Sequence, residues 1–127
     1  MAGHRAERLA QLIHQEISVM LAREIQDPRV IGASILRVQV SGDLRIAKIY
    51  VNATGRAPEE IKQMMEGLTR ASGYIRRQLT EGLELPIAPE LRFYADHSIE
   101  RGEQFLQVLD QVQTRQRGGQ KRKTNNE

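Results

Sequence analysis

Three arginines flank a glycine in a segment whose residue types and spacing suit the binding of a phosphate group. Residues 68–77 read LTRASGYIRR and lie inside a helical hydrophobic pattern. Glycine in a helix interior costs about 1 kcal/mol relative to alanine, so Gly73 predicts a kink or a corner between two helices. Backbone N–H groups exposed at such a corner, together with Arg70, Arg76 and Arg77, would form a cradle for phosphate. The alternative is a purely structural bend between two packed helices.

The sequence lacks the residue patterns of catalytic and metal-binding sites. It contains no cysteine, which removes disulfides, thiolate metal sites and cysteine nucleophiles together. His4, His14 and His97 are far apart, and none of them heads a metal-ligand pattern. Asp96 and His97 have no serine in a nucleophile turn beside them, and no Walker phosphate loop is present. These absences argue against a metal site, a serine or cysteine nucleophile and a nucleotide-hydrolysing phosphate loop, and we expect no cofactor or metal.

A long first helix and a β-hairpin are the clearest elements. Apolar spacings of three and four predict a helix from about residue 5 to residue 25, ended by Asp27 and Pro28. Its apolar stripe consists of Leu9, Leu12, Ile13, Ile17, Met20 and Leu21. Alternating residues then predict strands at 34–40 and 44–51, joined by a turn at 41–43. The expected buried face carries Leu36, Val38, Val40, Ala47, Ile49 and Val51, with Arg37 and Lys48 opposite.

The second half of the chain predicts further helices and a third strand. Pro58 and the carboxylates at 59–60 open a helix that contains the interrupted segment and ends near Gly82. Residues 91–95 form a strand, and Ser98 caps a last helix. Leu91, Phe93 and Ala95 share one face of that strand, and the last helix carries Ile99, Phe105, Leu106, Leu109 and Val112. This order predicts an α+β fold, a small sheet covered by helices on one face and partly open on the other.

Length and charge indicate one folded domain followed by a basic tail. A chain of 127 residues can bury one ordinary core without a disulfide or metal, and we expect residues 1–114 to form that domain. Residues 115–127 are expected to be disordered; their charged residues are Arg115, Arg117, Lys121, Arg122 and Lys123 against Glu127. Such tails commonly touch nucleic acid, although a solubilising role explains the charge as well. The start lacks the apolar core of a secretory signal and no stretch has the length of a membrane span, so we expect a cytoplasmic protein without a membrane partner. We also expect a monomer.

Four segments, taken together and in this order, resemble the ribosome-binding factor A family. They are EIQDPR at 24–29, VSGDLRIAKIYV at 40–51, ASGYIR at 71–76, and PELRF with DHS at 89–93 and 96–98. The resemblance extends over most of residues 5–112. Its members are bacterial small-subunit assembly factors with a KH-type fold. Each segment alone is weak, but their combination and spacing are specific.

The resemblance implies a type II KH-like domain with the order helix, β-hairpin, kinked helix pair, third strand and C-terminal helix. An Ala-x-Gly kink, here Ala71-Ser72-Gly73, replaces the usual Gly-x-x-Gly loop, which occurs nowhere in this sequence. The backbone clamp of ordinary KH domains therefore does not transfer simply. The family resemblance further implies a non-enzymatic factor that binds the immature small (30S) ribosomal subunit. It would act on 16S ribosomal RNA near its 5′ end and the decoding neck, and support late processing and maturation, notably in the cold.

Residues in four regions, most of them basic, are the candidate RNA contacts, because phosphates dominate the recognition of folded RNA. They are Arg70, Ala71, Ser72, Gly73, Arg76 and Arg77 at the bend; Arg45 and Lys48 on the hairpin; Arg5 and Arg8 near the start; and Arg115, Arg117, Lys121, Arg122 and Lys123 in the tail. The alternative for each is a solvated surface charge. Tyr50, Tyr74 and Tyr94 would be able to stack on bases, but partial burial in the core is the competing reading.

Two other functions remain open from the sequence. One is a general nucleic-acid-binding protein without ribosome specificity, in which the bend and the tail contact any phosphate backbone. The other is a protein-interaction module whose basic tail binds an acidic partner.

Overall fold

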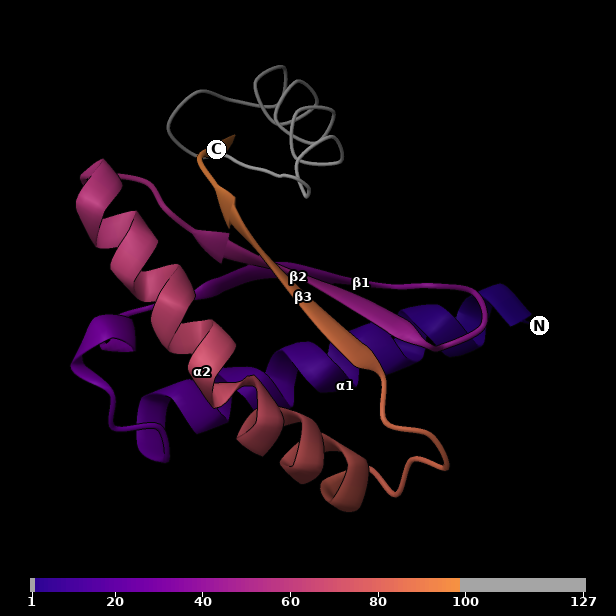
Figure 1. Ribbon diagram of the computed structural model, residues 1–127. Coiled ribbons are helices and arrows are strands. Elements are labelled where there is room, and N and C mark those ends of the chain that lie inside the picture. The colour runs from indigo at the N-terminus through magenta and orange to yellow at the C-terminus, as the bar shows by residue number, and fades with distance from the viewer. Residues whose placement is uncertain (1, 99–127) are drawn as a thin grey trace. The chain divides into compact units, whose positions relative to one another are not determined.

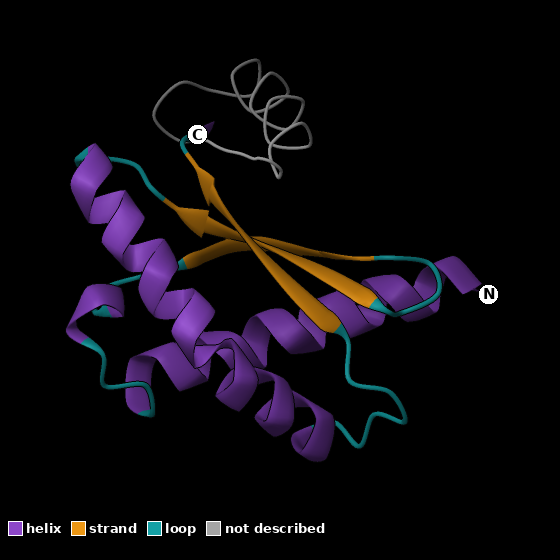
Figure 2. Ribbon diagram, in the orientation of Figure 1, coloured by secondary structure: helices purple, strands orange, loops and turns teal. Residues whose placement is uncertain are grey.

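The computed structural model describes residues 2–98, which divide into two units that are treated separately. The main unit comprises residues 2–52 and 56–95, whereas residues 53–55 and 96–98 belong to the second. The elements are α1 (Ala2–Arg23), the 3-10 helix η1 (Pro28–Val30), β1 (Ile35–Val40), β2 (Ile46–Asn52), α2 (Pro58–Gly82) and β3 (Glu90–Asp96). Both α-helices lie on one side of the three-stranded sheet (Figures 1 and 2), which confirms the predicted α+β class. The predicted last helix falls beyond residue 98, outside the described residues.

The helix α1 buries one stripe of apolar side chains against the sheet. Its fully buried residues include Ile13 and Ile17, as the periodicity predicts. Leu12 is 40% exposed, so its placement in the buried stripe was wrong. The buried positions span a single face that starts at Ala6, and Leu12 falls beyond the margin of that face. The helix ends at Arg23, ahead of the predicted stop.

The hairpin of β1 and β2 contains a β-bulge that changes which side chains face the core. Val38 pairs with Ile49 and Val40 with Ala47, but the register shifts by one residue between Ile35 and Arg37. The extra residue in this bulge is Leu36. Ile35 is consequently buried in the core in place of Leu36, and the prediction that Leu36 shares the face of Val38 and Val40 was wrong.

The turn between these strands is held by side-chain hydrogen bonds, as its sequence predicts. Asp43 Oδ1 accepts from Ser41 Oγ at 2.7 Å and from the Arg45 backbone N–H at 3.1 Å. Ser41 Oγ in turn accepts from the backbone N–H of Ile46 at 3.0 Å. Leu44 takes up a left-handed conformation with φ 65°, which lets this short loop reverse the chain.

The strand β3 extends the sheet beside β2, running parallel to it. The Glu90 backbone N–H donates to Arg45 O at 2.8 Å, and both arrows point the same way in Figure 1. A parallel pair needs a long crossover, which α2 supplies. Leu91 and Phe93 pack against the core, as predicted for one face of this strand. In the second unit, the Ala53 N–H donates to Asp96 O and the Ser98 N–H to Asp96 Oδ1.

The helix α2 covers the rest of the inner face and packs tightly on η1. It begins at Pro58 as predicted, and Glu60 Oε1 accepts a hydrogen bond from the Ala57 N–H at 2.8 Å. Its core residues Met64, Leu68, Ile75 and Leu79 are fully buried. A Cβ placed on Gly67 would lie 2.8 Å from Val30 Cγ1 and 3.1 Å from Arg29 Cβ. Gly67 therefore permits the close approach of α2 to η1.

Candidate nucleic-acid interface

The segment at residues 71–73 bends α2 without breaking it. The expected corner between two helices is absent, because α2 is one helix from Pro58 to Gly82. Figure 1 shows the ribbon of α2 changing direction near its middle. Ser72 Oγ donates to Thr69 O at 2.7 Å and Thr69 Oγ1 to Met65 O at 2.9 Å, a side-chain pattern that bends helices. Because helical bonding runs through the bend, the prediction of newly exposed backbone amides was wrong.

The three residues of the Ala-x-Gly sequence have different environments. Ala71 is half-buried and packs against the core, and Ser72 is half-buried as well. Gly73 is exposed, and an added Cβ would meet nothing within 4 Å. Packing therefore does not require glycine at this position, and the outer surface of the bend is open to a ligand.

Arg76 makes a structural contact with the loop before β3. Its Nε donates to Pro89 O at 2.9 Å, and its second terminal nitrogen donates to Ala88 O at 3.0 Å. The guanidinium thereby holds the loop that leads into β3. Arg76 is exposed and keeps further N–H donors, so its contact with RNA stays a prediction beside this structural role.

Arg70 and Arg77 are exposed on the surface of the bend. Close to them, Tyr74 OH donates to Glu24 Oε1 at 2.6 Å and links α2 to the residue that follows α1; this hydrogen bond raises the pKa of Tyr74. Tyr74 is 37% exposed, so the predicted core burial does not apply to it. The side chains of Arg70 and Arg77 are thus accessible from solvent at the bend.

An arginine and an aspartate before α2 form a tight pair that sequence reasoning did not single out. Arg29 donates to both carboxylate oxygens of Asp27, with a shortest distance of 2.6 Å. The hydrogen bonds from Arg29 lower the pKa of Asp27 to about 2, and Arg70 contributes a smaller electrostatic part. Arg29 is thus engaged with Asp27, and the electrostatic effect of Arg70 shows that the bend lies near this pair.

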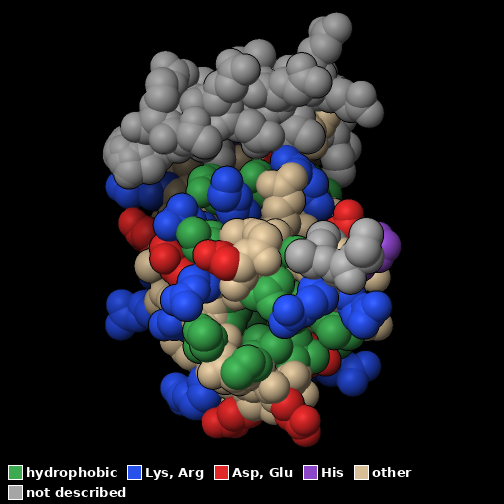
Figure 3. Space-filling view, turned by 90° about the vertical axis from the view of Figure 1, so that its right-hand side faces the viewer, with side chains coloured by type: hydrophobic (Ala, Val, Ile, Leu, Met, Phe, Trp, Pro, Cys, Tyr) green, Lys and Arg blue, Asp and Glu red, His purple; other side chains and the backbone are tan. Residues whose placement is uncertain are grey.

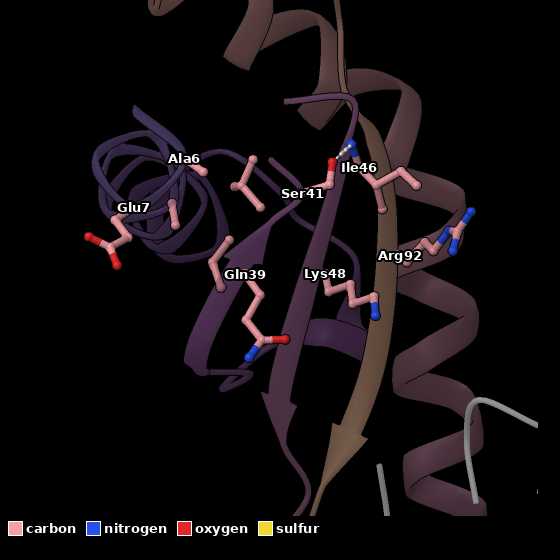
Figure 4. A pocket seen from close by; sticks show the side chains of 10 residues that line it. Ala6, Glu7, Gln39, Ser41, Ile46, Lys48 and Arg92 are labelled. Carbon is pink, nitrogen blue, oxygen red and sulfur yellow. Dashed lines mark hydrogen bonds between the residues drawn. The ribbon is translucent and has the colours of Figure 1, made fainter. Parts of the chain in front are cut away.

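A groove at the turn end of the hairpin brings two groups of candidates together. Its volume is about 560 Å³. In Figure 4, Ala6 and Glu7 of α1 lie on one side, with Lys48 of β2 and Arg92 of β3 on the strands. The exposed Arg5 and Arg8 belong to the same turns of α1 as these lining residues, and the exposed Arg45 lies at the end of the hairpin. The N-terminal and hairpin candidates therefore share one end of the main unit.

The face of the sheet opposite the helices carries a stack that sequence reasoning missed. The guanidinium carbon of Arg37 lies 3.8 Å from the ring centroid of Tyr50, and the rings of Tyr50 and Tyr94 stack at 5.3 Å. Tyr50 is only 6% exposed. The sequence could have placed Tyr94 on this face, because Arg92 and Tyr94 alternate with the core-facing residues of β3.

Positive charge is spread over the surface. Figure 3 shows Lys and Arg side chains scattered over the viewed face, with hydrophobic and acidic side chains between them. The tail candidates, residues 115–127, lie outside the described residues. Over residues 2–98, no group of three or more His, Cys, Asp or Glu side chains would hold a metal, and no helix has the length and apolarity to cross a membrane.

Comparison with known proteins points to one family. The family model for ribosome-binding factor A matches residues 5–109. Ribosome-binding factor A from Halothermothrix orenii is 41% identical over 112 residues, covering 88% of this chain and 91% of the relative.

Solved structures agree with this match. A solution NMR structure from Thermotoga maritima, described as a ribosome-binding factor A, has TM-score 0.54 and 31% identity, covering 80% of this chain and 92% of that one. A homology model of the Thermus thermophilus ribosome-binding factor A, fitted into a cryo-EM map of its complex with 30S, has TM-score 0.51 and 25% identity, covering 73% of this chain and 99% of that one. These likenesses confirm the predicted KH-like fold.

Proposed function

The chain belongs to the ribosome-binding factor A family, and on this premise we propose that it binds the small (30S) ribosomal subunit as a non-enzymatic assembly factor. The observation that carries the proposal is the family match over residues 5–109. It is supported by the Thermus thermophilus relative, whose fitted coordinates belong to a 30S complex. The cytoplasm is the compartment in which such a subunit is assembled, and we place the protein there.

The proposed RNA contacts are cations in two regions of the main unit, all of them exposed except the half-buried Lys48. Arg70 and Arg77 lie at the bend of α2; the other region is the turn end of the hairpin, with Arg45, Lys48, Arg5 and Arg8. Folded RNA is recognised mainly by shape and phosphate position, and the arginine fork suits phosphate oxygens. Two separated groups of cations would fix the orientation of the protein on the subunit, which a single patch would not.

The proposed action is a shift between conformers of immature 16S ribosomal RNA. A protein that binds one conformer more tightly raises its population, by no more than its difference in affinity for the two. Late processing of 16S ribosomal RNA would follow when the bound conformer is the one that processing requires. A need for the protein in the cold fits this mechanism if RNA conformers exchange slowly there.

The basic residues 115–127 are proposed to add phosphate contacts outside the folded domain, 1–114. Each contact with single-stranded RNA changes log K by about 0.7 for each tenfold change in salt. Truncation before Arg115 should therefore weaken RNA binding and flatten its salt dependence. Thermal unfolding should change little, because the tail contains no large apolar side chain.

Sucrose-gradient sedimentation of cell extracts tests the proposal. The protein should travel with free 30S subunits and be scarce on complete ribosomes, because an assembly factor leaves before the subunits join. Even distribution over all ribosomal fractions, or absence from them, would contradict it.

A second candidate is a general nucleic-acid-binding protein, favoured by the spread of cations over the surface in Figure 3. Such a protein would bind unrelated RNA as tightly as 30S subunits at the same salt concentration. Competition separates the two functions: excess transfer RNA should leave the 30S complex intact if binding depends on subunit shape, and should dissolve it if binding is general.

A further inference from the structure

The sheet face opposite α1 and α2 carries polar and aromatic side chains from all three strands. They alternate with core residues such as Ile49 and Phe93, so the register fixes which side they occupy. This outer sheet face is defined by Arg37 and Gln39 of β1, Lys48 and Tyr50 of β2, and Arg92 and Tyr94 of β3.

One row of this outer sheet face is a stack that crosses the strands. Because β2 lies between β1 and β3, Arg37 and Tyr94 reach Tyr50 from opposite sides. Arg37 lies over the Tyr50 ring, and Tyr94 stacks on that ring with an interplanar angle of 23°. Tyr50 OH donates to Gln39 Oε1 at 3.3 Å. Tyr50 is thus held in place, and Tyr94 forms the half-buried β3 end of the stack.

The neighbouring row supplies positive charge. Gln39 and Lys48 are register partners, and both line the hairpin groove together with Arg92 (Figure 4). Arg92 is paired with Glu90 at 2.8 Å, an interaction that raises the pKa of Arg92 and lowers that of Glu90. Among the described residues of this row, two cations, Lys48 and Arg92, therefore face one carboxylate, that of Glu90. This excess is complementary to a phosphate backbone.

We propose that the outer sheet face binds a short single-stranded segment of RNA. One base would stack on Tyr94 and continue the existing stack, while Lys48 and Arg92 contact the adjacent phosphates. The amide of Gln39 lies beside Lys48 on the neighbouring strand β1 and offers both donor and acceptor to a base edge. The inference rests on the proposed function, since the small subunit would supply this RNA.

The chemistry favours a single strand over a duplex or an acidic peptide. A base inside a duplex is stacked on its neighbours and cannot reach a side-chain ring, whereas an unpaired base can. An acidic peptide would use the cations but leave the tyrosine stack without a role. Among the described residues, this surface carries two stacked aromatic rings next to a row with Lys48 and Arg92.

The test uses the full chain and a fluorescently labelled RNA heptamer, with a blunt RNA duplex as the second probe. Anisotropy titrations compare Tyr94→Leu, Tyr94→Phe and Lys48→Ala with the parent. Tyr94→Leu removes the ring and should weaken heptamer binding by about 5-fold or more, as expected for one base stacked on an aromatic side chain. Tyr94→Phe keeps the ring and should bind the heptamer like the parent. Neither change should alter duplex binding.

Lys48→Ala tests the same surface without touching the stack. It should lower the slope of log K against log salt for the heptamer by about 0.7, the value for one phosphate contact with a single strand. If Tyr94→Leu fails to fold, heptamer binding by Lys48→Ala and by Tyr94→Phe still tests whether the outer sheet face binds RNA. Unchanged heptamer affinity and salt slope in Lys48→Ala, or parent-like heptamer binding by folded Tyr94→Leu, would overturn the inference.

Sedimentation of the same variants with purified 30S subunits separates this inference from the proposed function. If the parent binds subunits but the heptamer results are negative, the outer sheet face is not an RNA site and the assembly function stands. If heptamer binding depends on Tyr94 but the parent does not sediment with subunits, the RNA site stands and the assembly function fails.

Discussion

The two halves of α2 differ in what lies against them. In the first half, Gly67 faces η1 so closely that an added Cβ would lie 2.8 Å from Val30 Cγ1. In the second half, Gly73 faces open space, and the neighbouring Arg76 holds the loop before β3. Both halves bury core residues, but the glycine of the first half lies against another element, whereas that of the second half is exposed beside a polar anchor.

This difference shows that residues adjacent in sequence need not share a function. Gly73 stood out because arginines flank it, yet packing does not require it. Arg76 and Arg77 are neighbours, but Arg76 is engaged with the backbone of another segment while Arg77 is exposed. At least one arginine of this run therefore has a structural role.

The largest loss of stability is expected from Gly67→Ala. The new methyl group must displace Val30 or the Arg29 side chain, and overpacking of this kind costs about 1–3 kcal/mol. Urea unfolding should show a lower midpoint with little change in slope. An unaltered midpoint would mean that η1 moves away freely and that the first half of α2 is not closely packed.

A somewhat smaller loss of stability is expected from Arg76→Ala. The change removes hydrogen bonds to Pro89 O and Ala88 O, and a charged donor near the surface contributes about 1 kcal/mol. The matched control is Arg77→Ala, which removes the same charge from the next position. Hydrogen exchange at the start of β3 should accelerate in the first variant only; equal exchange in both would refute the anchoring role of Arg76.

Gly73→Ala should raise the stability of the fold, whereas the two preceding substitutions lower it. The site has room for the methyl group, and alanine is favoured over glycine within a helix by about 0.5–1 kcal/mol. The unfolding midpoint should rise slightly while binding to 30S subunits is retained. Destabilisation would show that the bend depends on glycine at this position, which would make the two halves of α2 alike.

The smallest effect concerns pH. The pKa of Asp27 is about 2 in the fold and 3.8 without its partners, because Arg29 donates hydrogen bonds to it. A lowered folded-state pKa stabilises the fold above pH 3.8, and this contribution is lost as the pH falls through about 2. Asp27→Asn should therefore unfold more easily than the parent at neutral pH. The difference should shrink between about pH 4 and pH 2, and a constant difference would contradict the pairing.

Much of the fold was predictable because its periodic patterns are local. The helical stripe of α1 and the alternation in β2 and β3 predicted the class of fold and most of the core residues, and the structure confirms both. Leu36 was misplaced because a bulge shifts the register, and nothing in the alternation of β1 reveals an extra residue.

The candidate site was less predictable because its contacts are long-range. The carbonyls that bind Arg76 lie 12 and 13 residues away in an irregular loop. The neighbours of Gly67 belong to η1, and no local pattern identifies which glycine of a helix meets another element. The stack of Tyr50 and Tyr94 joins strands that are separated by all of α2.

The most direct test of the central claim is the affinity of charge-reversal variants for immature 30S subunits. Arg77→Glu lies on the exposed bend, whereas Lys62→Glu makes the same change of charge on the exposed surface of the first half of α2. Loss of a charge-assisted phosphate contact should weaken subunit binding by about 10-fold or more in Arg77→Glu. Lys62→Glu should stay within about 2-fold of the parent, since one distant exposed charge is largely screened at physiological salt. Equal losses in the two variants would show that binding depends on overall charge and not on the bend.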